Sequence, residues 1–145
     1  MTHKKRVLIL CTGNSARSQM AEGLLRRMAN DIFTVESAGT DPGRVRAEAI
    51  AVMNAVGIDI SDHRSKSVDE FAGRHFDVVI TVCDNAKETC PTFPGKALRL
   101  HQSFSDPALA QGDQAARFDT FRRVRDEISS WLEKFVGEQR GGNVI

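Results

Sequence analysis

A cysteine and an arginine near the start of the chain have side chains that together suit chemistry on a tetrahedral oxyanion. Both lie in the stretch C-T-G-N-S-A-R-S, residues 11–18, which follows the apolar run Arg6–Leu10. A thiolate is a strong nucleophile, and the planar guanidinium of Arg17 fits two oxygens of phosphate, arsenate or sulfate. An apolar strand that ends at Cys11 therefore predicts a nucleophile placed inside an anion-binding loop.

The short residues between Cys11 and Arg17 suit a turn whose backbone N–H groups point toward a bound anion. Gly13 permits backbone conformations that a Cβ atom resists. The start of a helix and a nearby guanidinium both favour a thiolate, so the sequence predicts a lowered pKa for Cys11. We expect the whole loop to bind the oxyanion: Cys11, Thr12, Gly13, Asn14, Ser15, Ala16, Arg17 and Ser18.

Three residues outside the loop have types that suit the same chemistry. Asp106 precedes Pro107 in the stretch S-D-P-A, and its carboxyl group can protonate a departing oxygen. An Asp-Pro pair by itself more often makes only a turn. Cys83 and Cys90 are separated by six residues. So few cysteines cannot form a disulfide scaffold; in a reducing compartment they are catalytic, metal-binding or inert.

The rest of the chain alternates between strands and helices, which predicts a parallel sheet. We expect strands at Arg6–Leu10, Phe33–Ser37, Phe76–Cys83 and Ala97–Leu100. We expect helices from Ser15 or Arg17 to Met28, over Arg44–Val56 with Gly57 as cap, near Val68–Ala72, and from about Asp113 to Glu138.

Strands joined by helical crossovers predict a single α/β domain over residues 1–145. Its three layers are a four-stranded parallel sheet with helices on both faces. Ligands of such sheets bind at the carboxyl ends of the strands. Because Cys11 and Cys83 each follow a predicted strand, we expect both thiols at this edge.

These motifs resemble the oxyanion loop and the general-acid loop of the low-molecular-weight protein tyrosine phosphatase superfamily. The likeness covers nearly the full chain, including E-S-A-G at 36–39 and G-I-D-I-S-D-H-R-S-K at 57–66. Phosphatases of this group usually carry tyrosines just after the Asp-Pro loop, and this chain has no tyrosine. With the Cys83 and Cys90 pair, the sequence more narrowly resembles the thioredoxin-coupled arsenate reductases built on this fold.

That resemblance implies reduction of arsenate to arsenite, as in arsenic detoxification. It makes Cys11 the nucleophile, Arg17 an oxyanion ligand and Asp106 the general acid. Cys83 would attack the Cys11 sulfur and expel arsenite, leaving a Cys11–Cys83 disulfide. Cys90 would then attack Cys83, and the Cys83–Cys90 disulfide would be reduced by an external dithiol. We expect the segment between these two cysteines to be mobile.

One position departs from the family pattern. Some members bind potassium beside the loop through an Asn, a Glu, a Ser and an Asp. Asn14, Glu22 and Ser37 match the first three, whereas Lys66 stands where the Asp is expected. An ammonium group there can replace the ion and keep Asn14 oriented, so we expect activity without potassium.

Composition narrows the partners and the compartment. The net charge of +1 gives no general attraction to nucleic acid or to a membrane surface, and no apolar run approaches about 20 residues. The basic start M-T-H-K-K-R precedes too short an apolar run for a signal peptide. The histidines are scattered and no Cys-x2-Cys occurs, so we expect no metal and no cofactor. We expect a cytoplasmic monomer.

Two other functions remain open from the residues alone. A phosphatase acting on a phosphoester or phosphoamino acid would need the loop and Asp106 but neither Cys83 nor Cys90. A non-catalytic thiol module, such as a redox sensor or an arsenite trap, would need the cysteines but neither Arg17 nor Asp106. Thioredoxin is the expected reductant, with glutaredoxin as the alternative. Phosphate and sulfate are expected competitors of arsenate, with residual phosphatase activity.

Overall fold

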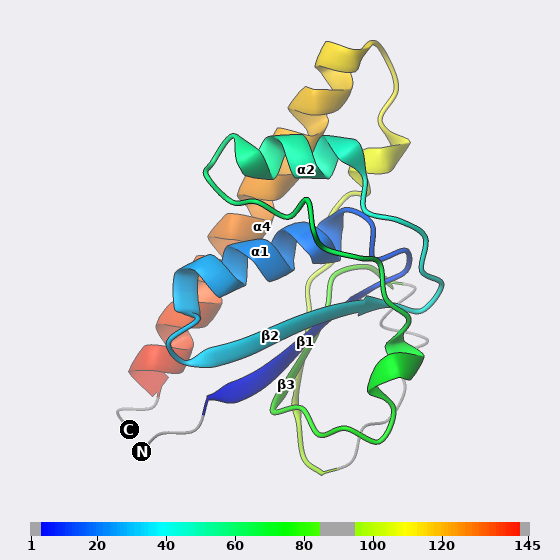
Figure 1. The fold of residues 1–145 in the computed structure, drawn as a ribbon. Coiled ribbons are helices and arrows are strands. Elements are labelled where there is room, and N and C mark those ends of the chain that lie inside the picture. The colour runs from blue at the N-terminus through cyan, green and yellow to red at the C-terminus, as the bar shows by residue number, and fades with distance from the viewer. Residues whose placement is uncertain (1–3, 85–94, 143–145) are drawn as a thin grey trace.

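A computed structural model describes residues 4–84 and 95–142 of the chain. Its strands are β1 (Lys5–Cys11), β2 (Phe33–Gly39), β3 (Val78–Thr81) and β4 (Leu98–His101), all parallel in the order β2-β1-β3-β4 (Figure 1). The predicted α/β fold with a four-stranded parallel sheet is confirmed. Because β1 is central, the loop that follows Cys11 lies at the middle of the carboxyl edge.

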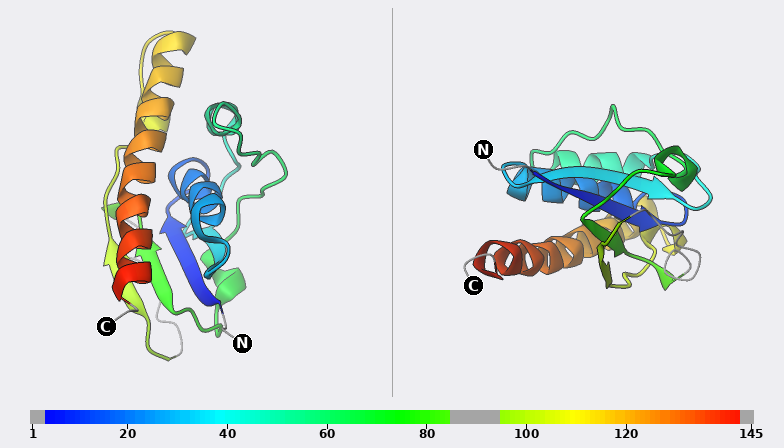
Figure 2. Two further views of the ribbon diagram at one scale, coloured as in Figure 1. Left: turned by 90° about the vertical axis from the view of Figure 1, so that its left-hand side faces the viewer. Right: turned by 90° about the horizontal axis from the view of Figure 1, so that it is seen from below.

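The α-helices that lie wholly within residues 4–84 and 95–142 are α1 (Arg17–Ala29), α2 (Ala47–Asn54) and α4 (Gln114–Gly142). Two 3-10 helices, η1 (Val68–Phe71) and η2 (Pro107–Leu109), lie in the connections. Helix α1 packs against β1, β2 and α4, and α2 packs against α4, so these helices form a layer on one side of the sheet (Figures 1 and 2). This layer supports β1 and the start of α1, which flank the loop.

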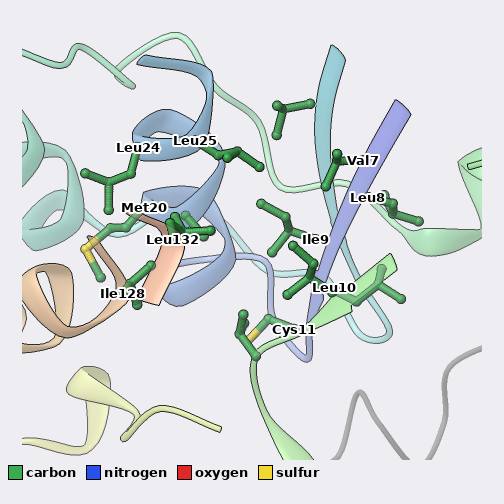
Figure 3. Close-up of a cluster of buried hydrophobic side chains, with 14 of the residues drawn as sticks. Val7, Leu8, Ile9, Leu10, Cys11, Met20, Leu24, Leu25, Ile128 and Leu132 are labelled. Atoms are coloured by element: carbon green, nitrogen blue, oxygen red, sulfur yellow. The ribbon is translucent and has the colours of Figure 1, made fainter. Parts of the chain in front are cut away.

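The apolar run of β1 forms the centre of the core, since Val7 to Leu10 are all fully buried. Figure 3 shows Ile9 on the side of α1 and α4, together with Met20 and Leu132, whereas Leu8 points away from these helices. Leu8 is nevertheless 0% exposed, so both faces of the strand are covered. An apolar strand buried on both faces is the pattern expected of a central parallel strand.

Most element boundaries differ from the sequence predictions by one to four residues, and three of these differences bear on the site or the core. Helix α2 begins at Ala47 instead of Arg44, because Arg46 has an extended backbone and backbone N–H groups between residues 40 and 46 bond to the loop. Strand β3 ends at Thr81, so Cys83 lies beyond the strand. Helix α4 continues to Gly142 past the expected Glu138, and Arg140 near its end pairs with Asp31.

Candidate active site

Hydrogen bonds from outside fix the carbonyl groups of the loop between β1 and α1. Backbone N–H groups of residues 40–46 donate to four loop carbonyls at 2.9–3.1 Å: those of Cys11, Thr12, Gly13 and Ser15. Ser65 Oγ adds a 2.8 Å bond to the Gly13 carbonyl. All described peptides are trans, so each N–H points opposite to the carbonyl of its own peptide. The anchored carbonyls therefore turn the loop N–H groups toward the inside.

Asn14 is the conformational pivot of this loop. Its φ of 48° lies in the left-handed region, which is uncommon for a residue other than glycine. Its fully buried side chain donates to Ser18 Oγ at 2.8 Å and Ser37 Oγ at 2.9 Å, and its Oδ1 accepts from the Lys66 backbone N–H at 2.9 Å. These bonds hold the strained backbone in place.

Gln19 completes this network and was not among the sequence-predicted site residues. Its Nε2 lies 2.9 Å from Asn14 Oδ1, 3.2 Å from the Asn14 carbonyl and 3.0 Å from the Arg64 carbonyl. Its Oε1 lies 2.9 Å from His63 Nδ1, so Nδ1 is the donor of that pair. A glutamine in the first turns of a helix gives no sequence signal of this role, because its partners come from another loop.

The predicted support residues meet behind the loop. Ser37 Oγ accepts from Asn14 and donates to Glu22 Oε1 at 2.5 Å. The buried Glu22 carboxylate also faces Arg26 Nη2 at 2.8 Å and Lys66 Nζ at 3.7 Å. A buried carboxylate needs such charged partners. Asn14, Glu22, Ser37 and Lys66 thus form one cluster, with the ammonium group of Lys66 beside the carboxylate.

The side chain of Arg17 lies between the loop and the predicted acid. Its Nη1 donates to the Phe104 carbonyl at 3.1 Å, and its Nη2 lies 3.6 Å from Asp106 Oδ2. Asp106 Oδ1 in turn accepts from the Ala108 backbone N–H at 3.0 Å and so caps η2. Helix α1 has no side-chain cap and no acidic residue in its first turn, which leaves its N-terminus suited to an anion.

Two buried thiols meet at the bottom of the site. Cys11 is 3% exposed and Cys83 is 5% exposed. Cys83 Sγ lies 3.3 Å from Thr12 Oγ1 and its thiol hydrogen-bonds with Cys11. Residues 72 positions apart in the chain are thus brought together at the carboxyl edge, as predicted.

The predicted lowering of the Cys11 pKa is wrong for this arrangement. Hydrogen bonding with Cys83, followed by burial, raises the pKa of Cys11, and the opposing effects of Arg17 and the Thr12 N–H are smaller. The sequence indicated the guanidinium and the helix start, which favour a thiolate. It did not show that a second thiol would hold the proton on Cys11.

Some sequence predictions fall outside the structure or concern absences. Cys90, its disulfide with Cys83 and the expected mobility between them lie outside the described residues. Within residues 4–84 and 95–142, no group of three or more His, Cys, Asp or Glu side chains is placed to hold a metal ion. In the same part of the chain, no helix is long and apolar enough to cross a bilayer.

An oxyanion loop at the carboxyl edge of a parallel sheet, with a cysteine at its start and an arginine at its end, defines a class of phosphate-binding α/β enzymes. Residues 6–140 match the family described as low molecular weight phosphotyrosine protein phosphatase. The chain belongs to this family.

Within the family, the chain is similar to proteins named arsenate reductase. The one from Halalkalibacterium halodurans is 41% identical over 134 residues, or 92% of this chain and 96% of that protein. A solved arsenate reductase in its oxidized state has a TM-score of 0.77 at 31% identity and covers 92% and 98% of the two chains. A thioredoxin-dependent arsenate reductase from Corynebacterium glutamicum has a TM-score of 0.72 at 26% identity, covering 97% of this chain and 64% of that one.

Proposed function

We propose that this protein reduces arsenate to arsenite through a thiol relay that begins at Cys11. The observation that carries the proposal is the contact between the Cys83 thiol and Cys11 inside an oxyanion loop. Attack on a phosphoester and hydrolysis of the cysteinyl phosphate do not require a second thiol beside the nucleophile. The curated relatives at about 40% identity, named arsenate reductase, support the same activity.

In the first step, the loop N–H groups and Arg17 bind arsenate with its arsenic atom facing Cys11 Sγ. Because Cys83 favours the protonated thiol, an oxygen of the bound oxyanion takes the Cys11 proton as the S–As bond forms. Asp106, held beside Arg17, gives a proton to the departing oxygen, which leaves as water. Arsenic remains As(V) in the resulting adduct.

The second step is the reduction. The thiolate of Cys83 attacks Cys11 Sγ, an S–S bond forms, and the S–As bond breaks. Both electrons of that bond stay on arsenic, which leaves as arsenite, while the two cysteines are oxidised to a disulfide. The Cys83 proton goes to solvent. Since Cys83 already contacts Cys11, this step needs little rearrangement of the chain before attack.

Cys90 then attacks Cys83, which frees Cys11 and leaves the Cys83–Cys90 disulfide for an external dithiol. Thioredoxin is the proposed reductant, in line with the C. glutamicum protein of similar fold, and glutaredoxin is the alternative. Sparse cysteines whose thiols serve a redox relay suit a reducing compartment, so we place the protein in the cytoplasm. We propose that it acts as a monomer.

The cluster behind the loop supports activity without potassium. Lys66 places its ammonium group 3.7 Å from Glu22, the carboxylate that a potassium ion would need. Asn14 is oriented by Ser18, Ser37 and the Lys66 backbone. The positive charge that the ion supplies in some family members is therefore part of the chain.

Arsenate-dependent consumption of NADPH, with thioredoxin and thioredoxin reductase, tests the proposal. The parent protein should turn over, whereas Cys83→Ser and Cys90→Ser should each lose multiple turnover. Mass spectrometry of the Cys90→Ser protein after one turnover should find the Cys11–Cys83 disulfide. No arsenate-dependent oxidation with either thioredoxin or glutaredoxin and glutathione would exclude the reductase.

A phosphatase is the second candidate, because the family also contains phosphotyrosine phosphatases. Cys11, Arg17 and Asp106 alone are sufficient for attack on a phosphoester and protonation of its leaving group. Hydrolysis of an aryl phosphate that survives Cys83→Ser, together with no arsenate reduction by the parent, would favour this function.

A further inference from the structure

The chain around Cys83 is bridged by a histidine to which the proposed mechanism gives no role. His101, at the end of β4, places Nδ1 2.7 Å from Thr81 Oγ1 and Nε2 3.0 Å from Asp84 Oδ1. Thr81 precedes Cys83 by two residues and Asp84 follows it directly. The imidazole therefore connects the end of β3 to the residue just after the relay thiol.

The partners of His101 define which nitrogen donates. An ionised carboxylate only accepts hydrogen bonds, so Nε2 donates to Asp84. In the neutral ring, Nδ1 then accepts from the Thr81 hydroxyl. If the ring is protonated, the hydroxyl can turn toward the Leu100 carbonyl at 3.5 Å and accept from Nδ1. The bridge thus persists in both protonation states.

The bridge begins where the backbone contacts of the sheet end. Val82 donates its N–H to the Leu10 carbonyl at 3.0 Å and accepts from the Phe104 N–H at 3.2 Å. The chain then leaves the sheet at Cys83, and the side chain of His101 reaches from β4 to Asp84. On its other side, Cys83 Sγ faces Thr12 Oγ1. The position of Cys83 is therefore restrained through the residues on either side of it, Val82 and Asp84, and through the contact of its sulfur with Thr12.

We propose that His101 is a positioning residue that acts through Asp84 to aim the Cys83 thiolate at Cys11 Sγ. Displacement at sulfur requires the attacking sulfur in line with the S–As bond that breaks, so small errors in its placement slow the step. The inference rests on the proposed arsenate reduction and concerns only its second step. Attack of Cys11 on an oxyanion forms no bond to Cys83. A small change in the aim of the Cys83 sulfur should therefore affect this first step much less than the second.

Two measurements separate the two steps. The first is the rate of the arsenate-dependent Cys11–Cys83 disulfide in a single turnover, followed by quenched mass spectrometry in the Cys90→Ser background. The second is hydrolysis of an aryl phosphate, which needs the oxyanion loop and Asp106 but no attack by Cys83. The variants are His101→Ala, Asp84→Ala and Asp84→Asn. His75→Ala is the matched control, since His75 also bonds beside β4, but its partner, the Lys96 carbonyl, precedes that strand, whereas His101 lies at its end.

Loss of one hydrogen bond should slow disulfide formation by about three- to tenfold in His101→Ala and Asp84→Ala. Aryl phosphate hydrolysis should stay within about twofold of the parent. Asp84→Asn keeps an acceptor for Nε2 and should restore the rate of disulfide formation, which a role in folding alone does not predict. The control should resemble the parent in both assays.

Three results would overturn the positioning role. These are an unchanged disulfide rate in both alanine variants, a parallel fall of both activities, or an Asp84→Asn protein as slow as Asp84→Ala. A Cys90→Ser parent that forms no disulfide with arsenate would instead overturn the proposed function itself, and this inference with it.

Discussion

Gly39 is the residue whose replacement tests most directly whether the backbone of the loop, and not only its side chains, binds the oxyanion. It ends β2 and pairs in register with Cys11. A Cβ atom at Gly39 would lie 2.5 Å from the Thr12 carbonyl oxygen, 3.0 Å from the Asn14 nitrogen and 3.1 Å from the Asn14 Cβ. Because two of these atoms are backbone, no side-chain rotation relieves the overlap.

The size of the effect follows from these distances. The Cβ–oxygen distance is well inside the 3.4 Å at which ordinary contact begins, so the loop must move by close to 1 Å. Overpacking of this kind costs about 1–3 kcal/mol of unfolding free energy, or about 3–10 °C in Tm for a chain of this size. Misplacement of catalytic groups by about 1 Å can cost about 100-fold in rate. Gly39→Ala should thus lower kcat/KM strongly while the protein remains folded at the assay temperature.

The assay compares kcat/KM for arsenate with the thermal midpoint in Gly39→Ala and Gly43→Ala. Gly43 lies in the same connection and also has an ordinary φ, but a Cβ atom there meets nothing within 4 Å. Its N–H bond to the Gly13 carbonyl would remain. A Gly39→Ala protein within about threefold of the parent in kcat/KM would refute the argument from backbone placement.

Three further predictions concern the network and the thiol pair. Replacing potassium in the buffer should leave the kcat/KM of the parent unchanged, whereas Lys66→Asp should make it potassium-dependent; a strong effect in the parent contradicts the role of Lys66. Gln19→Leu leaves the Asn14 and Arg64 carbonyls without this donor and should lower the unfolding free energy by about 1–3 kcal/mol in urea melts; an unchanged value contradicts it. Cys83→Ala removes the largest cause that raises the Cys11 pKa. Alkylation of Cys11 should therefore reach half its maximal rate at a lower pH than in the parent. An equal or higher pH of half-maximal alkylation would contradict the role of Cys83 in raising the Cys11 pKa.

The fold could be predicted from the sequence because strands and helices are indicated by local patterns of apolar residues. The apolar run before Cys11 predicts a strand buried on both faces, and the stripe through Phe121 and Ile128 predicts a core-facing helix; all of these are buried. The predicted helix start at Arg44 was wrong for a non-local reason, since the helix begins at Ala47. Residues 44–46 have helix-compatible types, but the Arg46 N–H bonds to the Ser15 carbonyl, which belongs to a loop far away in sequence.

The same distinction applies to the site. Loop chemistry could be read from residue types, since Cys11 and Arg17 lie in one short stretch. The roles of Gln19 and of the His101 bridge could not, because their partners belong to other connections. The raised pKa of Cys11 has the same origin, since it depends on a thiol 72 positions away. Tertiary contacts thus determine both the pKa of the Cys11 thiol and the position of the Cys83 thiol.

The two thiols are held in very different ways, and this suits the order of the proposed steps. Cys11 begins a loop whose carbonyls are anchored by residues 40–46 and Ser65, with Asn14 held by further buried bonds. A loop backbone held by this many hydrogen bonds provides the preorganisation that oxyanion binding requires. Cys83 instead leaves the sheet just beyond Val82. It must first meet Cys11 and then part from it, so a bridge of single hydrogen bonds can aim the thiol without preventing its later movement.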